Sequence, residues 1–286
     1  MKIPKRLQPL VEDGLIDEVI SRLMSGKEAD VFVVRANGET RCAKVYKDAM
    51  KRSFKKAAQY QEGRQIANSR RARAIAKGSK FGREQQEEIW QNAEVDALYQ
   101  LAAAGVRVPK PYGCYDGVLL MELVQSDDGD IAPRLDDVIL TEEQALEDHA
   151  LMIHYVKLML CTGIIHGDLS EFNILVDDYG PVIIDLPQAV NAAANNSAFA
   201  MLKRDVDNLA NYYGQYAPML KNTAYAEEMW ALYEAGELTP DTELSGAHQT
   251  AATNADVDSV LAEIQAVLAE EEARQARLKA AEEGED

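Results

Sequence analysis

The sequence has 286 residues, which suits one large domain or two lobes that share a cleft. Its 47% hydrophobic content supports a substantial core, and its formal net charge of −18 argues against nucleic-acid binding by the chain as a whole. The longest apolar runs fall far short of the roughly 20 residues that span a bilayer, and the N-terminus lacks the apolar core of a secretory signal. We therefore expect a cytoplasmic protein with no membrane partner.

The first half of the chain predicts a small antiparallel sheet. Asn37-Gly38 and Asp116-Gly117 are two-residue hairpin signals, because these residue types accept the positive φ angles that such turns need. A helix is expected between the two hairpins, where apolar residues recur at helical spacing before Gly105. The expected strands are 19–24, 31–35, 40–46, 112–115 and 118–124, and the helix is 84–104.

The second half of the chain is predicted to be mostly helical. A linker-like stretch, 125–133, precedes a helix that Thr141 caps and that ends before Gly163. Two short strands follow, at 174–176 and 182–185. Further helices are expected at 197–213, 225–235 and, as an acidic amphipathic segment, 255–279. The class is α+β, and the predicted boundaries are an N-lobe over 1–124, a C-lobe over 125–254 and a C-terminal helix and tail over 255–286.

The stretch from Ile165 to Asp185 has the spacing of a phosphoryl-transfer site. His166-Gly167-Asp168 is followed after four residues by Asn173, then by an apolar strand, a turn and a second strand leading to Asp185. Phosphoryl transfer needs an acceptor hydroxyl held in line and metal ions that bridge the phosphate oxygens. Asp168 is predicted to orient the hydroxyl, while Asn173 and Asp185 supply the oxygen ligands that Mg²⁺ prefers.

The first half supplies residues that would bind ATP. Lys44 lies on the third strand with apolar neighbours, as expected of a lysine that contacts the α- and β-phosphates, and Glu94 on the following helix would position it. The turn between the first two strands contains a single glycine and would cover the phosphates. The end of the last strand would read the adenine edge through its backbone. These predicted ATP-binding residues are Ser25, Gly26, Lys27, Glu28, Met121, Glu122 and Val124.

Together these segments resemble the RIO family of atypical protein kinases over residues 20 to 240. The resemblance is carried by SGKEADVF at 25–32, AKVYK at 43–47, MEL followed by DDGDIAPRL within 121–135, HGDLSEFNILV at 166–176 and IDLPQAV at 184–190. RDVDNL at 204–209 resembles a helix near the catalytic loop of the family. The run LSEFN is the most specific piece, because aminoglycoside and choline phosphotransferases place other residues between this Asp and Asn.

The resemblance implies a bilobal kinase fold, with ATP and Mg²⁺ or Mn²⁺ as cofactors. It also implies phosphorylation of serine, on a protein substrate or on the enzyme itself, and an aspartyl-phosphate at Asp185 with ATPase activity. Two features depart from what is expected. Leu186-Pro187-Gln188 stands where the family pattern is closer to VSQ, and no APE motif of ordinary protein kinases follows. The apparatus that docks extended peptides is therefore expected to be absent.

One segment is strongly basic within this acidic chain. Residues 44–84 hold 13 Lys and Arg against 3 Asp and Glu, which suits either a solvated face or a surface for a ribosomal or RNA partner. Two alternatives therefore accompany the protein-kinase prediction. One is a small-molecule phosphotransferase of the aminoglycoside or choline type, and the other is an ATP-switched assembly factor for a ribonucleoprotein particle.

Overall fold

The computed structural model describes residues 3–26, 29–47 and 93–247. The chain divides into two compact units, Met1–Gly246 and Ala247–Asp286, and the account below concerns the first. The predicted C-terminal helix at 255–279 and most of the basic segment at 44–84 lie outside the described residues. Within the described part, no helix is long and apolar enough to cross a membrane.

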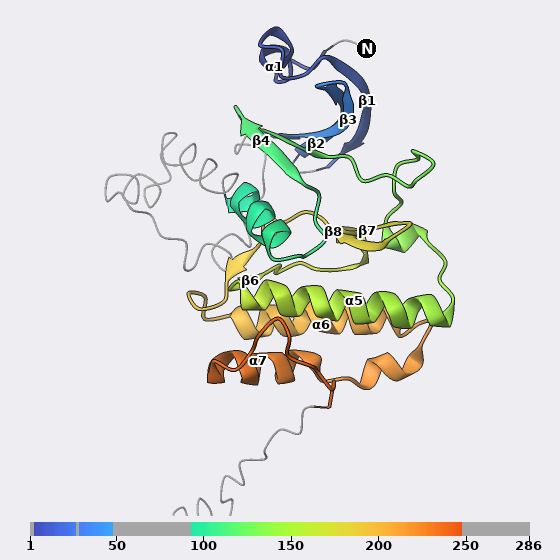
Figure 1. Cartoon of the computed structure of the whole chain (residues 1–286), viewed down its shortest axis with the longest axis vertical. Coiled ribbons are helices and arrows are strands. Elements are labelled where there is room, and N and C mark those ends of the chain that lie inside the picture. Colours follow the sequence, from blue (N-terminus) through green and yellow to red (C-terminus); the bar gives the residue numbers. More distant parts are fainter. Residues whose placement is uncertain (1–2, 27–28, 48–92, 248–286) are drawn as a thin grey trace, which may run out of the picture. The chain divides into compact units, whose positions relative to one another are not determined.

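A five-stranded antiparallel sheet forms the first lobe (Figure 1). Its strand order is β1-β2-β3-β5-β4, so β5 of the last hairpin pairs with β3 and β4 forms the edge of the sheet. Both predicted hairpins are present: Asn37 and Gly38 have φ of 54° and 78°, and Asp116 and Gly117 have 47° and 77°. The strands are β1 Glu18–Ser25, β2 Ala29–Ala36, β3 Glu39–Tyr46, β4 Pro111–Tyr115 and β5 Val118–Glu122.

Helices cover the two faces of this sheet. The short helix α1, Gln8–Glu12, places Leu10 against Phe32 and Val34 of β2 in one apolar cluster. On the other face, a helix over 93–103 contributes Leu98 to the main core. Because alternate residues of a strand face opposite ways, β3 presents Ala43 to the first cluster and Lys44 toward the second lobe. This alternation lets Lys44 reach Asp185 of the second lobe.

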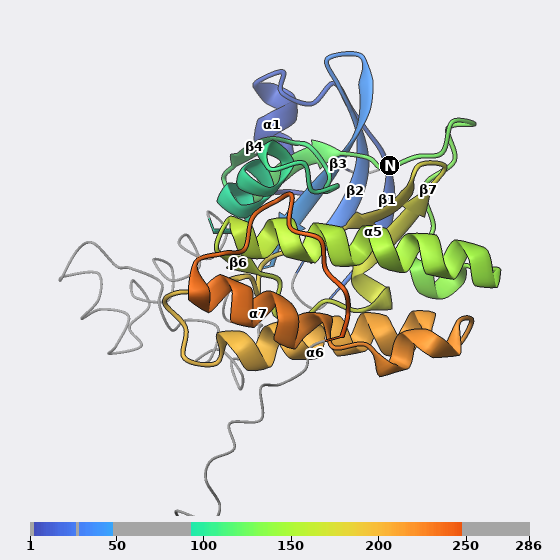
Figure 2. The ribbon, with the colours of Figure 1, turned by 60° about the horizontal axis from the view of Figure 1, so that its bottom comes forward.

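Three helices form the second lobe, and they lie side by side (Figure 2). Thr141 begins α5 with a capping box, accepting from the Gln144 N–H while the Gln144 side chain accepts from the Thr141 N–H. The long helix α5 buries ten of its side chains and is the centre of the core. The helices are α5 Glu142–Cys161, α6 Ala198–Tyr213 and α7 Tyr225–Ala235, with short 3-10 turns η2 Leu135–Asp137, η3 Glu171–Asn173 and η4 Pro218–Asn222.

Four short strands position the loops of the site. The hairpin of β7, Ile174–Asp177, and β8, Gly180–Ile183, returns the chain toward Asn173, as predicted. The prediction of a strand ending at Asp185 is wrong: β8 ends at Ile183, and Asp185 has a left-handed φ of 67°. A second pair, β6 Ile164–Ile165 with β9 Val190–Asn191, brackets both loops. The predicted α+β, bilobal kinase-like class is confirmed.

Candidate active site

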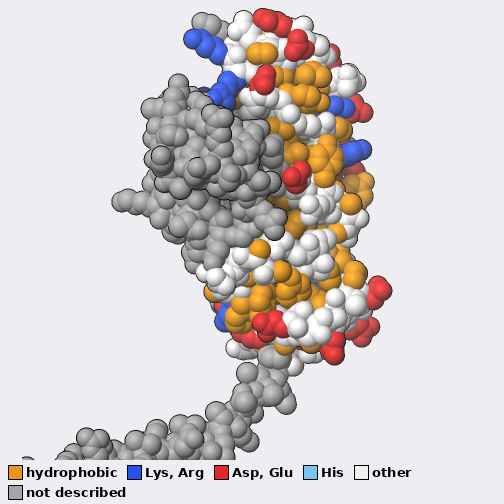
Figure 3. All heavy atoms as spheres, turned by 90° about the vertical axis from the view of Figure 1, so that its left-hand side faces the viewer, with side chains coloured by type: hydrophobic (Ala, Val, Ile, Leu, Met, Phe, Trp, Pro, Cys, Tyr) orange, Lys and Arg blue, Asp and Glu red, His pale blue; other side chains and the backbone are white. Residues whose placement is uncertain are grey.

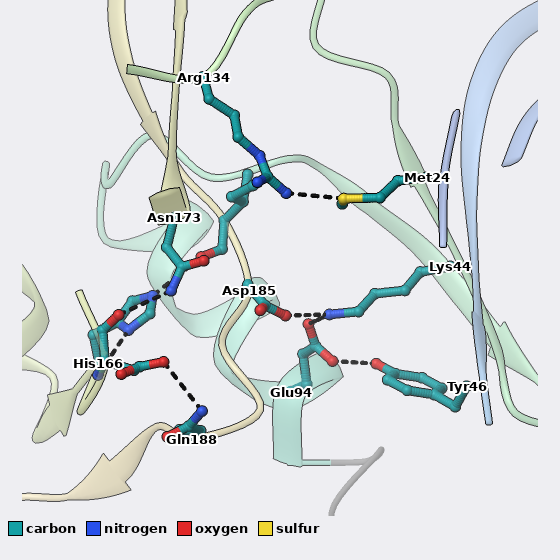
Figure 4. A network of polar contacts seen from close by, with 11 residues as sticks. Met24, Lys44, Tyr46, Glu94, Arg134, His166, Asn173, Asp185 and Gln188 are labelled. Atoms are coloured by element: carbon teal, nitrogen blue, oxygen red, sulfur yellow. Dashed lines mark hydrogen bonds and ion pairs between the residues drawn. The ribbon is translucent and has the colours of Figure 1, made fainter. Parts of the chain in front are cut away.

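Lys44 is the centre of a polar network that joins the two lobes (Figure 4). Its Nζ donates to Glu94 Oε1 and to Asp185 Oδ1, each at 2.6 Å. The lysine comes from β3 and Glu94 from the helix over 93–103, whereas Asp185 comes from the loop after β8. The predicted pairing of Lys44 with Glu94 is therefore present, and the same ammonium group also holds the predicted metal ligand.

The pair of Lys44 and Glu94 is the buried part of this network. Glu94 is only 3% exposed, and the hydroxyl of Tyr46 donates to its second oxygen. Burial alone would lower the pKa of Lys44, but Asp185 and Glu94 outweigh it and raise that pKa above the ordinary lysine value. Lys44 is therefore a fixed cation at any ordinary pH.

The Asp185 carboxylate is held at one oxygen and open at the other side. Its side chain is 44% exposed, so solvent or a ligand can reach it. Its surroundings would raise its pKa by desolvation, but the charge and hydrogen bond of Lys44 prevail and hold the pKa below the usual aspartate value. An ionised, accessible carboxylate fixed beside a lysine suits a divalent cation next to phosphate oxygens.

Asp168 lies exposed in the loop after β6, and the side chains of Gln188 and Asn173 donate hydrogen bonds to it. Gln188 lies in the segment that follows Asp185, and its Nε2 donates to Asp168 Oδ2 at 3.2 Å. Asn173 Nδ2 donates to the Asp168 backbone carbonyl at 2.8 Å. The amide nitrogen of Asn173 is thus engaged with the loop, which makes its Oδ1 the atom available to a metal.

His166 links the loop that carries Asp168 to the loop that carries Asp185. Its Nε2 lies 3.1 Å from the Ile184 carbonyl, and its Nδ1 lies 3.3 Å from the Asp168 N–H. A ring protonated at Nε2 satisfies both contacts, because that nitrogen then donates and Nδ1 accepts. Burial lowers the pKa of His166, which favours this neutral form.

Helix α6 anchors the backbone of the catalytic loop. Asp205, which is buried, accepts from the N–H groups of Gly167 and Leu169 at 2.7 and 3.0 Å. On the same helix, Asn208 donates to the Leu169 carbonyl at 2.9 Å and Arg204 donates to the Gly167 carbonyl. Burial raises the pKa of Asp205 to about 7, although its two N–H donors favour the ionised form.

Hydrogen bonds hold the two ends of the predicted phosphate turn, which joins β1 to β2. Ser25 Oγ donates to Asp30 Oδ1 at 2.7 Å, and Lys47 Nζ donates to the Gly26 carbonyl at 2.5 Å. The Gly26 N–H donates to the Ala29 carbonyl at 2.9 Å, closing the turn between β1 and β2. Two of its predicted members, Lys27 and Glu28, lie outside the described residues.

The predicted adenine-reading segment leaves the end of β5. Met121 packs against both the main core and a small cluster of Val33, Cys42 and Leu123. The Glu122 N–H donates to the Lys110 carbonyl at 2.8 Å, and the Glu122 carboxylate accepts from the Lys110 N–H at 3.0 Å. The Val124 carbonyl accepts from the Ala132 N–H at 3.0 Å, so this strand end is held in an extended form beside the linker.

The residues present suit a Mg²⁺ ion bound with a nucleotide. Asp185 and Asn173 offer one hard carboxylate and one amide oxygen, and Mg²⁺ typically takes one or two such protein ligands together with substrate phosphates. In the described part of the chain, no three His, Cys, Asp or Glu side chains come together as a metal cluster. The donor set is therefore one that a nucleotide would complete.

Several contributors received no role from the sequence alone. Each of them lies in one of the segments that carry the family resemblance, but the sequence does not indicate which backbone group or carboxylate it contacts. Asp205, for example, is separated from Gly167 by 38 positions. These residues are Tyr46, His166, Gln188, Arg204, Asp205 and Asn208.

Comparison with known proteins identifies related sequences. Residues 30–226 match the family model of the RIO domain. The RIO-type serine/threonine-protein kinase Rio1 of Haloferax volcanii is 33% identical over 207 residues, covering 71% of this chain and 66% of that protein. The human serine/threonine-protein kinase RIO1 is 31% identical over 206 residues, covering 71% of this chain and 34% of that protein. The match thus spans two thirds or less of each relative's length.

A solved structure shares the fold. The crystal structure of the Rio2 kinase–ADP/Mg²⁺–phosphoaspartate complex from Chaetomium thermophilum has a TM-score of 0.57 and 21% identity, covering 92% of this chain and 75% of that chain. Its sheet-and-helix arrangement agrees with the one described above. With the RIO domain matched from residue 30 to residue 226 and relatives alike over 71% of its length, this chain belongs to the RIO family.

Proposed function

We propose that this chain is an ATP- and Mg²⁺-dependent serine/threonine protein kinase of RIO type. The observation that carries the proposal is the network of Lys44, Glu94 and Asp185, with exposed Asp168 on the adjoining loop. These groups supply a phosphate-binding cation, a metal ligand and an acceptor-orienting carboxylate, which is the set that phosphoryl transfer needs. The cytoplasmic location stays a prediction.

Each side chain then has a stated task. Lys44 contacts the phosphates of ATP, and backbone groups of the segment from Met121 to Val124 that are not already bonded within the protein read the adenine edge. Asn173 and Asp185 hold Mg²⁺, which when bound neutralises phosphate charge. Asp168 accepts a hydrogen bond from the acceptor hydroxyl and orients it toward the terminal phosphorus. Ser25 and Gly26, with Lys27 and Glu28 that follow them in the sequence, cover the phosphates.

The test compares Asp168→Ala with the unaltered full chain. Transfer of label from γ-labelled ATP to protein should fall by at least about 100-fold, because the acceptor is no longer oriented. ATP binding measured by calorimetry should be largely unchanged, since Asp168 does not touch Lys44. Wild-type transfer by this variant would refute the assignment.

We further propose that Asp185 itself accepts a phosphoryl group, giving an aspartyl-phosphate and slow ATP hydrolysis. The carboxylate is ionised, open to solvent and positioned by Lys44, so it is a competent oxygen nucleophile. An oxygen of Asp185 would form the new bond to the γ-phosphorus, and the bond to the ADP oxygen would break. Hydrolysis of the acyl phosphate would return the free carboxylate.

Acid-quenched protein after reaction with γ-labelled ATP tests this step. Label that hydroxylamine releases and that maps to Asp185 supports it, because hydroxylamine cleaves acyl phosphates. Label that survives hydroxylamine and maps only to serine contradicts it. Asp185→Asn serves as the control, and it should carry no labile label.

The partner remains a separate proposal. The basic composition of 44–84 supports an anionic partner such as ribosomal RNA, and ATP turnover measured with and without ribosomal subunits would reveal it. Arg70, Arg71, Arg73, Lys77, Lys80 and Arg83 are the basic residues we expect to take part. Binding that does not weaken between low and physiological salt would contradict this partner.

RIO membership favours a protein substrate over the small-molecule alternative, and a phosphorylation assay on protein and metabolite pools separates the two.

A further inference from the structure

Arg134 is a cation beside the proposed nucleotide site that the roles above do not use. It stands between the linker and η2, and its backbone is fixed on the second lobe: it forms an isolated bridge with Leu175 of β7, and the preceding Pro133 carbonyl accepts from the Val176 N–H at 2.9 Å. It also accepts from the Asp137 N–H through its own carbonyl at 3.0 Å. The side chain therefore starts from a backbone position that is held against β7.

The guanidinium crosses from the second lobe toward the phosphate turn. Its Nη2 lies 3.0 Å from Met24 Sδ on β1, one residue before Ser25. Figure 4 shows the Arg134 side chain directed toward Met24. Its charge is close enough to Asp185 to help keep the pKa of that carboxylate low.

This cation lacks an anionic partner among the described residues. No ion pair of Arg134 is formed with a carboxylate there, and its side chain's hydrogen-bond partner is a thioether, which is a weak acceptor. A guanidinium carries five N–H donors arranged to bind a phosphate or carboxylate bidentately. A half-buried arginine that meets only a thioether therefore retains most of its capacity to bind an anion.

The groups around Lys44 carry a net negative charge, so a bound phosphate needs a further cation. Lys44 faces two carboxylates, Glu94 and Asp185, so these three groups carry one net negative charge, and Asp168 adds another. Lys47, the other described lysine near the phosphate turn, is paired with Asp30 at 3.2 Å. A polyphosphate that binds beside Lys44 needs a cation that is not already neutralised, and Arg134 is the described residue placed to provide it.

We propose that Arg134 binds the phosphate chain of the nucleotide, exchanging its contact with Met24 for phosphate oxygens. The inference rests on the proposed function, because it assumes that ATP binds beside Lys44 and Asp185. Arg134 would act from the second lobe while Lys44 acts from the first. The phosphates would then lie between two cations supplied by opposite walls.

The experiment measures ADP and adenosine binding by calorimetry to the full chain and to Arg134→Met. Methionine keeps the apolar stem near Met24 and removes the charge, so ADP affinity should fall by about 10- to 100-fold, the range of lost charge-assisted hydrogen bonds. Adenosine affinity should change less than about twofold, since adenosine has no phosphate. Arg134→Lys should give an intermediate ADP affinity, because it keeps the charge without the fork.

Two control variants make the result specific. Arg35→Met removes an exposed arginine of β2, whose partner Glu18 is 3.9 Å away, and should leave both affinities unchanged. Met24→Leu removes the thioether and should not weaken ADP binding. Loss of ADP and adenosine affinity to the same extent in Arg134→Met, or no loss of either, would overturn the inference, as would a Met24→Leu defect equal to that of Arg134→Met. If the unaltered chain binds neither ADP nor ATP, the proposed function fails together with this inference.

Discussion

Asp185 lies two residues past the end of β8, in a conformation that L-residues seldom adopt. A left-handed φ in a residue other than glycine costs about 1 kcal/mol or more, and such positions concentrate at functional sites. Here the conformation turns the carboxylate toward Lys44 while the next residue, Leu186, returns to the core. The apolar run from Val182 to Ile184 in the sequence predicted a strand, but it contained no signal for this local reversal.

Gln188 provides a test at the scale of one residue. Its amide holds Asp168 Oδ2, so it fixes the carboxylate that orients the acceptor. We expect Gln188→Ala to lower kcat by about 10-fold, the value of one lost hydrogen bond of about 1 to 1.5 kcal/mol, with KM for ATP unchanged. Steady-state kinetics check this.

Gln188→Glu is the informative companion to that variant. It keeps the length of the side chain but replaces the donor with a second carboxylate facing Asp168. Like charges repel, so kcat should fall at least as far as in the alanine variant. If both variants keep the wild-type kcat, or if KM for ATP rises instead, the positioning role of Gln188 is wrong.

At the scale of elements, the hairpins and long helices were predictable, and the short pieces were not. Asn37-Gly38 and Thr141 carry local signals, a turn that needs positive φ and a capping box, and both appear where expected. The two-residue strands β6 and β9 have no local signal, because they exist only through pairing between Ile165 and Val190. The five-residue helix α1 is likewise too short for periodicity to reveal.

Helix α6 and the catalytic loop give a prediction about pH. Asp205 has a pKa of about 7 in the folded protein because of burial, above the usual aspartate value. An acid whose pKa is raised by folding binds its proton more tightly when folded, so its contribution to stability is full below the unfolded pKa. That contribution is lost as pH rises toward 7.

The measurement compares the free energy of unfolding of the full chain with that of Asp205→Asn at pH 5 and pH 8. The difference, unaltered protein minus variant, should be smaller at pH 8, since asparagine does not titrate. The pH 5 value sets the baseline, because Asp205 is then protonated and, like asparagine, presents one carbonyl oxygen as acceptor. A difference that is constant or larger at pH 8 would show that Asp205 is ionised throughout.

At the scale of the whole molecule, one lysine ties the sheet lobe to the helical lobe. Hydrophobic side chains are spread along the face that Figure 3 shows. In the helical lobe, the Trp230 ring of α7 lies 5.6 Å from that of Phe199 and 5.4 Å from that of Tyr233. The apolar patterns of these helices predicted their existence but not their partners. The pairing of Lys44 with Asp185, 141 positions apart, was not among the predictions from the sequence, because no local pattern indicates it.

Lys44→Met should destabilise the described unit as well as weaken ATP binding. Removing the ammonium leaves the buried carboxylate of Glu94 without its cation, and breaking a buried ion pair costs about 3 to 5 kcal/mol. The second change Glu94→Gln, made in the same chain, should restore part of that stability because no buried charge remains. Denaturant unfolding of the two single variants and the double variant gives the coupling energy. Additive losses would contradict this account.

A metal prediction also belongs to the whole site. Mg²⁺ should bind only when nucleotide is present, because Asn173 and Asp185 leave most of its coordination to phosphate oxygens and water. Calorimetric titration of Mg²⁺ with and without ATP checks this. Tight binding of Mg²⁺ to the protein alone would contradict it.

The bond from Lys44 to Asp185 has a consequence for the order in which ligands arrive. In the described structure the lysine is already occupied, so an incoming phosphate must compete with a carboxylate for it. Any event that neutralises Asp185 removes the competitor: a cation at its free oxygen, or replacement by asparagine. Metal and nucleotide are therefore thermodynamically linked through one shared ammonium group, and each must raise the affinity for the other by the same factor. Asp185→Asn should accordingly bind metal-free ATP more tightly than the unaltered chain while losing the enhancement that Mg²⁺ provides.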